Sequence, residues 1–203
     1  MESEINARTQ GKEKASIEEL ILIKWRGAEI STEDSTLLAS FENLRSLSIL
    51  NAGLVTLKNF PNLPQIKELE LSDNKLTGNL EPILNCPELL KLSLAGNRIS
   101  GFDALEPLKL LASLGSIDLL GNPITQIPRY ADTMFEMFPE LQILDGLNKD
   151  GEEDSLFSGF EDSSEEEEDS DKNLSDFIDD TDEVSMSAKR AESSDSPLKK
   201  NIT

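Results

Sequence analysis

The chain has 203 residues, of which 19 are basic and 40 are acidic, and its net charge at pH 7 is −21. A protein with this charge does not bind nucleic acid by neutralising phosphates and is repelled by anionic membranes, but it attracts basic partners. The chain has no histidine and a single cysteine, Cys86. These counts exclude imidazole-based catalytic triads, histidine-ligated metal sites, an internal disulfide and a thiolate metal cluster.

The first residues of the chain, MESEINARTQGKEKAS, are polar and contain no signal-peptide core. No apolar run in the chain reaches the roughly 18 residues that a membrane span needs. We therefore expect a soluble intracellular protein. Residues 1–16 are assigned to an N-terminal polar segment and cap, in which a short helix leads into a first strand and Ile5, Ile17 and Trp25 help to cover the end of a core.

The central part of the chain carries five copies of the spacing L-x-x-L-x-L-x-x-N-x-L. Three copies are complete, one has alanine at the asparagine position, and one is degenerate with tryptophan there. The copies begin at Ile17, Leu44, Ile66, Leu89 and Leu114. Each L-x-L is predicted to be a short strand whose alternate side chains point into one core. The predicted fold is an α/β solenoid, a short capped leucine-rich repeat domain with a parallel concave sheet over residues 17–149.

The asparagine of each complete copy is predicted to be structural. Asn74, Asn97 and Asn122 turn the chain inward, and their amides can satisfy backbone groups that would otherwise stay unpaired at about 1–3 kcal/mol each. Cys86 stands on the connecting side of a coil just before a strand, where a small buried apolar residue is expected.

The segment RYADTMFEMFPELQILDG follows the last copy and is predicted to form a lid on the last coil. Met134, Phe138 and Leu141 recur at helical spacing, and Pro139 and Gly146 mark the end of the segment. The apolar residues available to cover the core are Tyr130, Met134, Phe135, Phe138, Leu141 and Leu144.

The positions between and just after the strand leucines are expected to face the concave side of the sheet. The later position is mostly apolar and has carboxylates beside it, which marks a docking strip for a partner with basic and apolar character. The strip consists of Ile23, Leu50, Glu68, Glu70, Ser72, Asp73, Asp118 and Leu120. The alternative is ordinary lateral packing between strands. No carboxylate pair is fixed in a catalytic geometry by sequence, so we expect no enzyme and no cofactor.

Residues 150–186 contain 17 acidic residues and one basic residue, a net charge of −16. Apolar residues are scarce there, so the segment is expected to be a disordered acidic tail that cannot bury enough surface to offset its ordering entropy. Serines followed three residues later by glutamate resemble acidophilic kinase sites, and a Ser-Pro pair resembles a proline-directed site. The candidate phosphorylation sites are Ser158, Ser163, Ser164 and Ser196.

Two apolar clusters interrupt the acidic tail. They are Leu156, Phe157 and Phe160, and Leu174, Phe177 and Ile178. Acid runs give fast, salt-sensitive attraction, whereas an aromatic side chain in a shallow pocket fixes the register of a partner. Histones are abundant basic proteins of eukaryotic cells, and the residues assigned to histone binding are Glu165, Glu166, Glu167, Glu168, Asp169, Asp176, Phe177, Ile178, Asp179 and Asp180. The alternative is a chance apolar interruption.

The last residues, 187–203, reverse the charge with four basic and two acidic side chains. Two basic pairs resemble a bipartite nuclear signal with a spacer shorter than usual. The pairs are Lys189 with Arg190 and Lys199 with Lys200. They predict a protein of the nucleus with a cytoplasmic pool, and the alternative is a basic counterweight to the acidic run.

From residue 17 to about residue 150 the chain resembles the acidic leucine-rich nuclear phosphoprotein 32 family. The likeness lies in IEELIL, ELELSDNKLTGNLEPILNCPELLKLSLAGNRIS, ALEPLKLLASLGSIDL and MFPELQILDG. The family architecture is a short capped solenoid, an acidic tail and a terminal basic nuclear signal. This chain departs from it in the short acid run 165–169 and in the cap, where Tyr130 is preceded by Arg129 and followed by Ala131.

The resemblance implies a non-enzymatic nuclear protein that binds histones, as a histone chaperone or chromatin regulator that restrains histone acetylation. In this reading the solenoid is the platform and the acidic tail is the main histone contact. The alternative is a protein phosphatase 2A inhibitor that acts through the leucine-rich repeat domain. A ribonucleoprotein scaffold is a third reading, since a spliceosomal leucine-rich repeat protein has a similar cap, but an acidic tail repels RNA. We expect a monomer without direct nucleic-acid or membrane contact.

Overall fold

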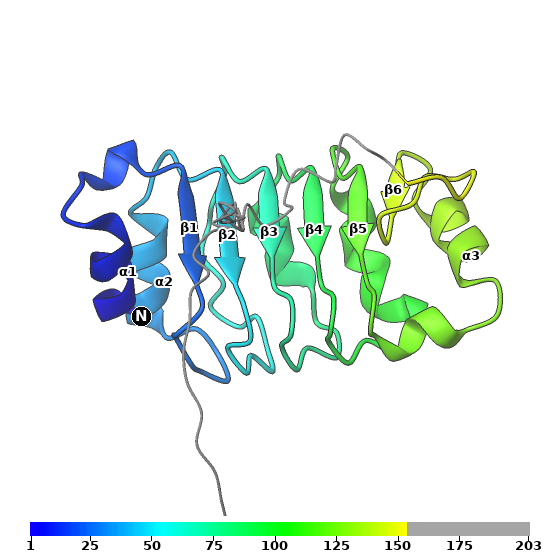
Figure 1. Ribbon diagram of the computed structural model, residues 1–203, viewed down its shortest axis with the longest axis horizontal. Helices are drawn as coiled ribbons and strands as arrows, with labels where there is room; N and C mark the ends of the chain where they lie inside the picture. The colour runs from blue at the N-terminus through cyan, green and yellow to red at the C-terminus, as the bar shows by residue number, and fades with distance from the viewer. Residues whose placement is uncertain (154–203) are drawn as a thin grey trace, which may run out of the picture. The chain divides into compact units, whose positions relative to one another are not determined.

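The computed structural model describes residues 1–153, which form a row of coils (Figure 1). The predicted acid run, apolar clusters, phosphorylation sites and nuclear signal fall on 154–203 and lie outside the described residues. No helix within the described part of the chain is long and apolar enough to cross a membrane.

Six short strands form one parallel sheet in chain order. The strands are β1 (Glu19–Leu22), β2 (Ser46–Ile49), β3 (Glu68–Glu70), β4 (Lys91–Ser93), β5 (Ser116–Asp118) and β6 (Ile143–Leu144). The first apolar residue of each L-x-L is in register across five strands, and this buried row consists of Leu20, Leu47, Leu69, Leu92 and Ile117. The predicted leucine-rich repeat fold with its parallel sheet is therefore confirmed.

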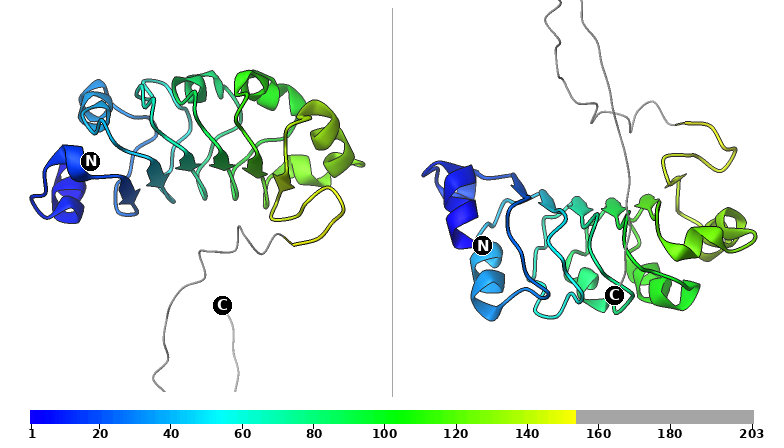
Figure 2. Two further views of the ribbon diagram at one scale, coloured as in Figure 1. Left: turned by 90° about the horizontal axis from the view of Figure 1, so that it is seen from above. Right: turned by 60° about the horizontal axis from the view of Figure 1, so that its bottom comes forward.

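Helical segments connect the strands and lie on the side of the sheet opposite its open face (Figure 2). They are α2 (Thr32–Ala39) and the 3-10 helices η2 (Glu81–Asn85), η3 (Phe102–Leu110) and η4 (Pro123–Gln126). Each one buries at least one apolar side chain, and these include Leu38, Ile83, Leu105 and Ile124. The helix α2 begins where Ser31 Oγ accepts a 3.0 Å hydrogen bond from the Asp34 backbone amide.

The N-terminal cap is built from α1 (Glu2–Thr9) and η1 (Lys14–Ser16). Ile5 is 1% exposed and packs onto the first coil. Glu4 Oε1 accepts hydrogen bonds of 2.8 Å from the backbone amides of Ile23 and Lys24, just beyond β1. A carboxylate of the cap helix thus satisfies backbone donors at the edge of the sheet, where no further strand can do so.

The C-terminal cap consists of α3 (Tyr130–Met137) and β6. Met134, Phe138 and Leu141 are buried, as their spacing predicts. The helix nevertheless ends at Met137, because a proline at 139 disfavours the helical region for the residue before it. Phe138 accordingly has φ −123° and ψ 84°.

Three buried asparagines satisfy backbone groups in the turns after β3, β4 and β5. Asn97 Oδ1 accepts a 3.0 Å bond from the Leu76 amide, and its Nδ2 donates to the Leu71 and Leu94 carbonyls at 2.9 Å. Asn74 and Asn122 bond in the same way to the preceding coil and to their own turn. Each of them joins two neighbouring coils, in agreement with the structural role inferred from the repeat.

We expect Asn97→Ala to lower the free energy of unfolding by about 1–3 kcal/mol, because it leaves the buried Leu76 amide without its acceptor, whereas the Leu71 carbonyl still accepts a bond from Asn74. Urea denaturation followed by circular dichroism measures the loss. The matched control is Asn62→Ala, at an exposed position, which should cost less than about 0.5 kcal/mol. Similar midpoints for the two variants would contradict the structural role of Asn97.

Candidate functional site

A groove of about 370 Å³ crosses the open face of the sheet from β1 to β5, and we call it the sheet groove. Most of its lining residues occupy strand positions whose side chains point away from the buried leucine rows. The lining consists of Glu19, Ile21, Ser46, Ser48, Leu50, Glu68, Leu69, Glu70, Lys91, Ser93 and Asp118. The alternation of side chains along each strand therefore builds this surface directly from the L-x-L repeat.

Serine hydroxyls hold the central carboxylates of the sheet groove in place. Ser48 Oγ donates a 2.9 Å hydrogen bond to Glu70 Oε2 on the neighbouring strand. Ser93 Oγ donates to Asp118 Oδ2 at 3.3 Å and lies 2.9 Å from Ser72 Oγ. These bonds run across the strands, so the position of the negative charge is set before any ligand arrives.

Negative charge dominates the sheet groove. Its charged side chains are four acidic and one basic, from Glu19, Glu68, Glu70, Asp118 and Lys91. Lys91 is the register partner of Glu68 across β3 and β4. Ile21 and Leu50 add apolar surface beside these charges. The groove therefore suits a ligand that carries both basic and apolar groups.

Half of the residues predicted for the docking strip line the sheet groove. They are Leu50, Glu68, Glu70 and Asp118. Ile23 and Leu120, at 42% and 54% exposure, follow the edge strand β1 and the fifth strand β5. Ser72 lies beside the groove through its contact with Ser93. Three acidic residues of the predicted docking strip therefore lie together in the groove, whereas Ile23 and Leu120 do not line it.

Asp73, the remaining predicted residue, lies away from the groove. It follows β3 with φ 58°, so the chain has already begun to turn at this residue. Asp73 lines a separate hollow along the turn edge of the coils, together with Lys75 and Arg98. The turn thus separates Asp73 from the carboxylates with which the sequence pattern grouped it.

Several groove residues are absent from the strip predicted by sequence. Glu19, Ser46 and Lys91 stand immediately before the first strand leucine. Because strand side chains alternate, the residue before the first leucine of L-x-L lies on the same face as the residue between the two leucines. These groove residues could therefore have been predicted from the L-x-L pattern. The middle positions Ser48 and Ser93 were identifiable as well, but their hydrogen bonds depend on which residue stands on the neighbouring strand.

Asp145 is a further carboxylate close to Asp118, and it lies in the C-terminal cap just after β6. Its Oδ1 accepts a 2.7 Å hydrogen bond from the Leu119 backbone amide. Burial raises the pKa of the Asp145 carboxyl, the bond from Leu119 opposes this shift, and the charge of Asp118 adds to it. Burial also raises the pKa of the Tyr130 hydroxyl, which faces Asp145 without completing a hydrogen bond of good geometry. At this end of the sheet, burial and the charge of Asp118 therefore disfavour the ionised form of the Asp145 carboxyl.

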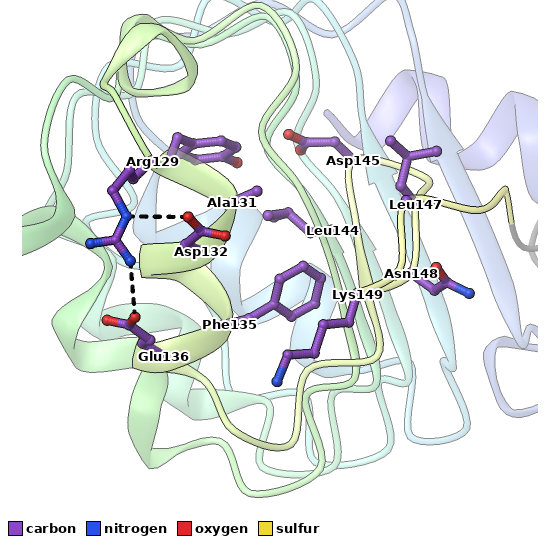
Figure 3. A pocket seen from close by; sticks show the side chains of 12 residues that line it. Arg129, Ala131, Asp132, Phe135, Glu136, Leu144, Asp145, Leu147, Asn148 and Lys149 are labelled. Carbon is purple, nitrogen blue, oxygen red and sulfur yellow. Dashed lines mark hydrogen bonds and ion pairs between the residues drawn. The ribbon is translucent and has the colours of Figure 1, made fainter.

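A second cavity, of about 590 Å³, opens between α3 and the loop that follows β6 (Figure 3), and we call it the cap pocket. Its larger apolar lining residues are Phe135, Leu144 and Leu147. Arg129, on the rim, forms ion pairs with Asp132 at 3.2 Å and Glu136 at 3.5 Å. Lys149 lies on the loop side of the same rim.

Both the sheet groove and the cap pocket present charged side chains next to apolar ones. Within residues 1–153, no group of three or more acidic or cysteine side chains is arranged to hold a metal ion. Cys86 is buried, and burial raises the pKa of its thiol to about 12, so it remains protonated near neutral pH.

A family model described as Leucine-rich repeat matches residues 22–155. Two curated relatives are both named acidic leucine-rich nuclear phosphoprotein 32 family member A, and they come from Drosophila pseudoobscura pseudoobscura and Drosophila melanogaster. Each is 39% identical to this chain over 153 residues, which is 75% of the chain and 57% of the relative. The predicted resemblance is confirmed, and the chain matches little more than half the length of these relatives.

A chain in the crystal structure of the Drosophila melanogaster SNF/U2A′ complex is also similar. It is 30% identical and superimposes with a TM-score of 0.52, and the match covers 64% of this chain and 72% of that chain. The similarity supports the assignment of the capped repeat fold.

We expect the free energy of unfolding of Asp145→Asn, relative to that of the unaltered protein, to increase as the pH rises above about 3.8, the ordinary pKa of this carboxyl. The folded-state pKa is raised, so the stability that the Asp145 carboxyl contributes is complete below the unfolded-state value. It is lost as the pH rises through the folded-state pKa, whereas an amide has no proton to lose. Urea denaturation at a series of pH values from about 3 to 7 measures the difference.

The control is Asp145→Ala, which also removes the acceptor for the Leu119 amide. Relative to Asp145→Asn it should cost about 1–3 kcal/mol throughout the pH range, because that amide is then unpaired and neither variant has a carboxyl to titrate. A constant difference between the asparagine variant and the unaltered protein at every pH would contradict a raised pKa at Asp145.

Proposed function

The chain belongs to the leucine-rich repeat family, and on this premise we propose that it is a non-enzymatic nuclear protein that binds histones or other basic proteins. The repeat domain is the platform and the acidic tail supplies the main histone contact. Histone chaperoning or regulation of chromatin is the activity that such binding would serve.

The acidic sheet groove is the observation that carries this proposal. Glu70 and Asp118 are held by serine hydroxyls on adjacent strands, and apolar side chains lie beside them. A lysine or arginine side chain would meet fixed carboxylates there while its aliphatic stem covers the apolar surface. The absence of histidine from the chain supports the non-enzymatic part of the proposal, because no imidazole is available to activate the groove serines.

The curated relatives support the nuclear part of the proposal, since both are named nuclear phosphoproteins. The distribution of charge supports a division of labour between domain and tail. Residues 150–186 carry a net charge of −16, which would accelerate encounter with a basic partner, whereas the preformed groove would select its orientation.

Inhibition of protein phosphatase 2A through the repeat domain is the second candidate function. One feature favours it: among residues 1–153, the lining of the sheet groove lies entirely between Glu19 and Asp118. The repeat domain therefore provides a groove that a partner of this domain alone could use.

We expect the double variant Glu70→Gln, Asp118→Asn to bind core histones about tenfold more weakly than the unaltered chain at low salt. The two amides keep the shape of the groove while removing its central charges. Calorimetric titration of the full-length protein into the histone dimer and the histone tetramer measures the change. The matched control, Glu81→Gln with Asp103→Asn, removes the same charge from exposed positions in η2 and η3.

Equal weakening in both double variants would mean that net charge alone governs binding, and the groove would then have no specific part in it. If the unaltered chain does not bind either histone complex at moderate salt, histone binding is rejected. Phosphatase inhibition, assayed with the same three proteins, then becomes the leading function.

We expect Phe177→Ala with Ile178→Ala to weaken histone binding at least fivefold at high salt, because buried aromatic and aliphatic anchors persist when charge attraction is screened. The control removes two apolar side chains near the terminus, Leu198→Ala with Ile202→Ala. Both proteins are titrated at low and high salt. Equal affinities for the two variants at high salt would reject the anchor.

A further inference from the structure

The cap pocket has an apolar lining that the described residues leave open. Leu147 is 40% exposed, and Phe135 is only partly buried against the core. The pocket volume of about 590 Å³ exceeds the roughly 150 Å³ that suffices to bind a benzene ring. Figure 3 shows Phe135 pointing from α3 toward the loop that carries Leu147 and Lys149. An aromatic side chain therefore has both room and apolar contacts there.

The chain itself leads to this pocket. After β6 it reverses twice: Leu144 and Leu147 exchange backbone hydrogen bonds of 2.8 and 3.0 Å, and Asn148 donates to the Glu152 carbonyl at 2.9 Å. The Asn148 side chain closes the second turn by accepting bonds from the amides of Asp150 and Glu152. Glu153 then pairs antiparallel with Leu147, which lines the pocket. The described chain thus ends beside the cavity.

The next residues, DSLFSGFED, contain Leu156, Phe157 and Phe160. Phe157 is four residues beyond Glu153, and a chain of that length reaches about 13 Å when extended. Phe160 reaches about 23 Å by the same measure. These lengths are sufficient for either ring to return to a pocket that is lined by Leu147, the pairing partner of Glu153.

The charges of the rim fit this segment. Arg129 is already paired with Asp132 and Glu136, whereas Lys149 is exposed and forms no ion pair with the other residues of 1–153. The segment carries carboxylates on both sides of its aromatic residues, at Asp154 and Glu161. One of them can pair with Lys149 while a ring fills the pocket.

We propose that the cap pocket is the binding site for residues 154–162 of the same chain, with Phe157 and Phe160 seated against Phe135 and Leu147. The contact completes the C-terminal cap and ties the root of the acidic tail to the repeat domain. It also gives the first apolar cluster of the tail an intramolecular role, separate from that of Phe177. The proposal does not depend on histone binding.

A disulfide trap tests the contact in the full-length chain. Cysteine is placed on the exposed pocket rim by Ala131→Cys and next to the aromatic residues by Gly159→Cys. Cys86 stays in place, because burial keeps its thiol protonated and inaccessible. The ratio of disulfide to thiol in a glutathione buffer gives the effective concentration of one cysteine at the other. The measurement is repeated after adding Phe157→Ala and Phe160→Ala, and after adding Phe177→Ala and Ile178→Ala.

We expect removal of Phe157 and Phe160 to lower the effective concentration at least tenfold, and removal of Phe177 and Ile178 to leave it unchanged. The cysteines and the connecting chain length are identical in all three proteins, so chain length cannot produce the difference. On the pocket side, Leu147→Ser should reduce trapping as the aromatic double variant does.

Equal trapping in all proteins would overturn the proposal and leave the cap pocket to a partner or to a second copy of the chain. Loss of trapping with the aromatic variant but not with Leu147→Ser would also overturn it, because the rings would then dock elsewhere.

Discussion

Each coil of this solenoid buries backbone amides and carbonyls that only a neighbouring coil, or a side chain in its place, can satisfy. Inside the row, parallel strands and the amides of Asn74, Asn97 and Asn122 meet this requirement. At the two ends there is no further coil, and carboxylates take over. Glu4 accepts bonds from Ile23 and Lys24 at one edge of the sheet. Near the other edge Asp145, which follows the two-residue strand β6, accepts a bond from the Leu119 amide just beyond β5.

The acidic residues of the described domain therefore have two different roles, one in satisfying backbone amides and one on the open face of the sheet. Glu4 and Asp145 are drawn into the ends of the fold, where they replace missing strands as hydrogen-bond acceptors. Glu70 and Asp118 remain on the open face, where serines orient them toward solvent and toward any ligand. Closing the sheet with carboxylates has a cost, since burial, together with the nearby charge of Asp118, raises the pKa of the Asp145 carboxyl.

The repeat spacing was sufficient to predict the first five strands, their register and the face on which the groove lies, because stacked coils repeat one set of contacts. The sixth strand, β6, lies in the segment that was predicted only as a lid on the last coil. It did not reveal α2 or the short 3-10 helices, among which η2 contains Pro82 and η3 contains Pro107. The partners of Glu4 and Asp145 are backbone amides, which leave no trace in residue type. Asp73 was misplaced because spacing alone does not show where a turn begins to leave the sheet.

The chain contains one tryptophan and one tyrosine, and the fold places them at opposite ends. Trp25 is buried just after β1, and Tyr130 begins α3 in the last cap. In a solenoid each coil contacts only its neighbours, so the two ends can loosen independently. The fluorescence of Trp25 and the absorbance of Tyr130 therefore serve as separate spectroscopic probes of unfolding at the two ends. Their coincidence or separation on heating distinguishes a molecule that melts as a single unit from one that frays from one side.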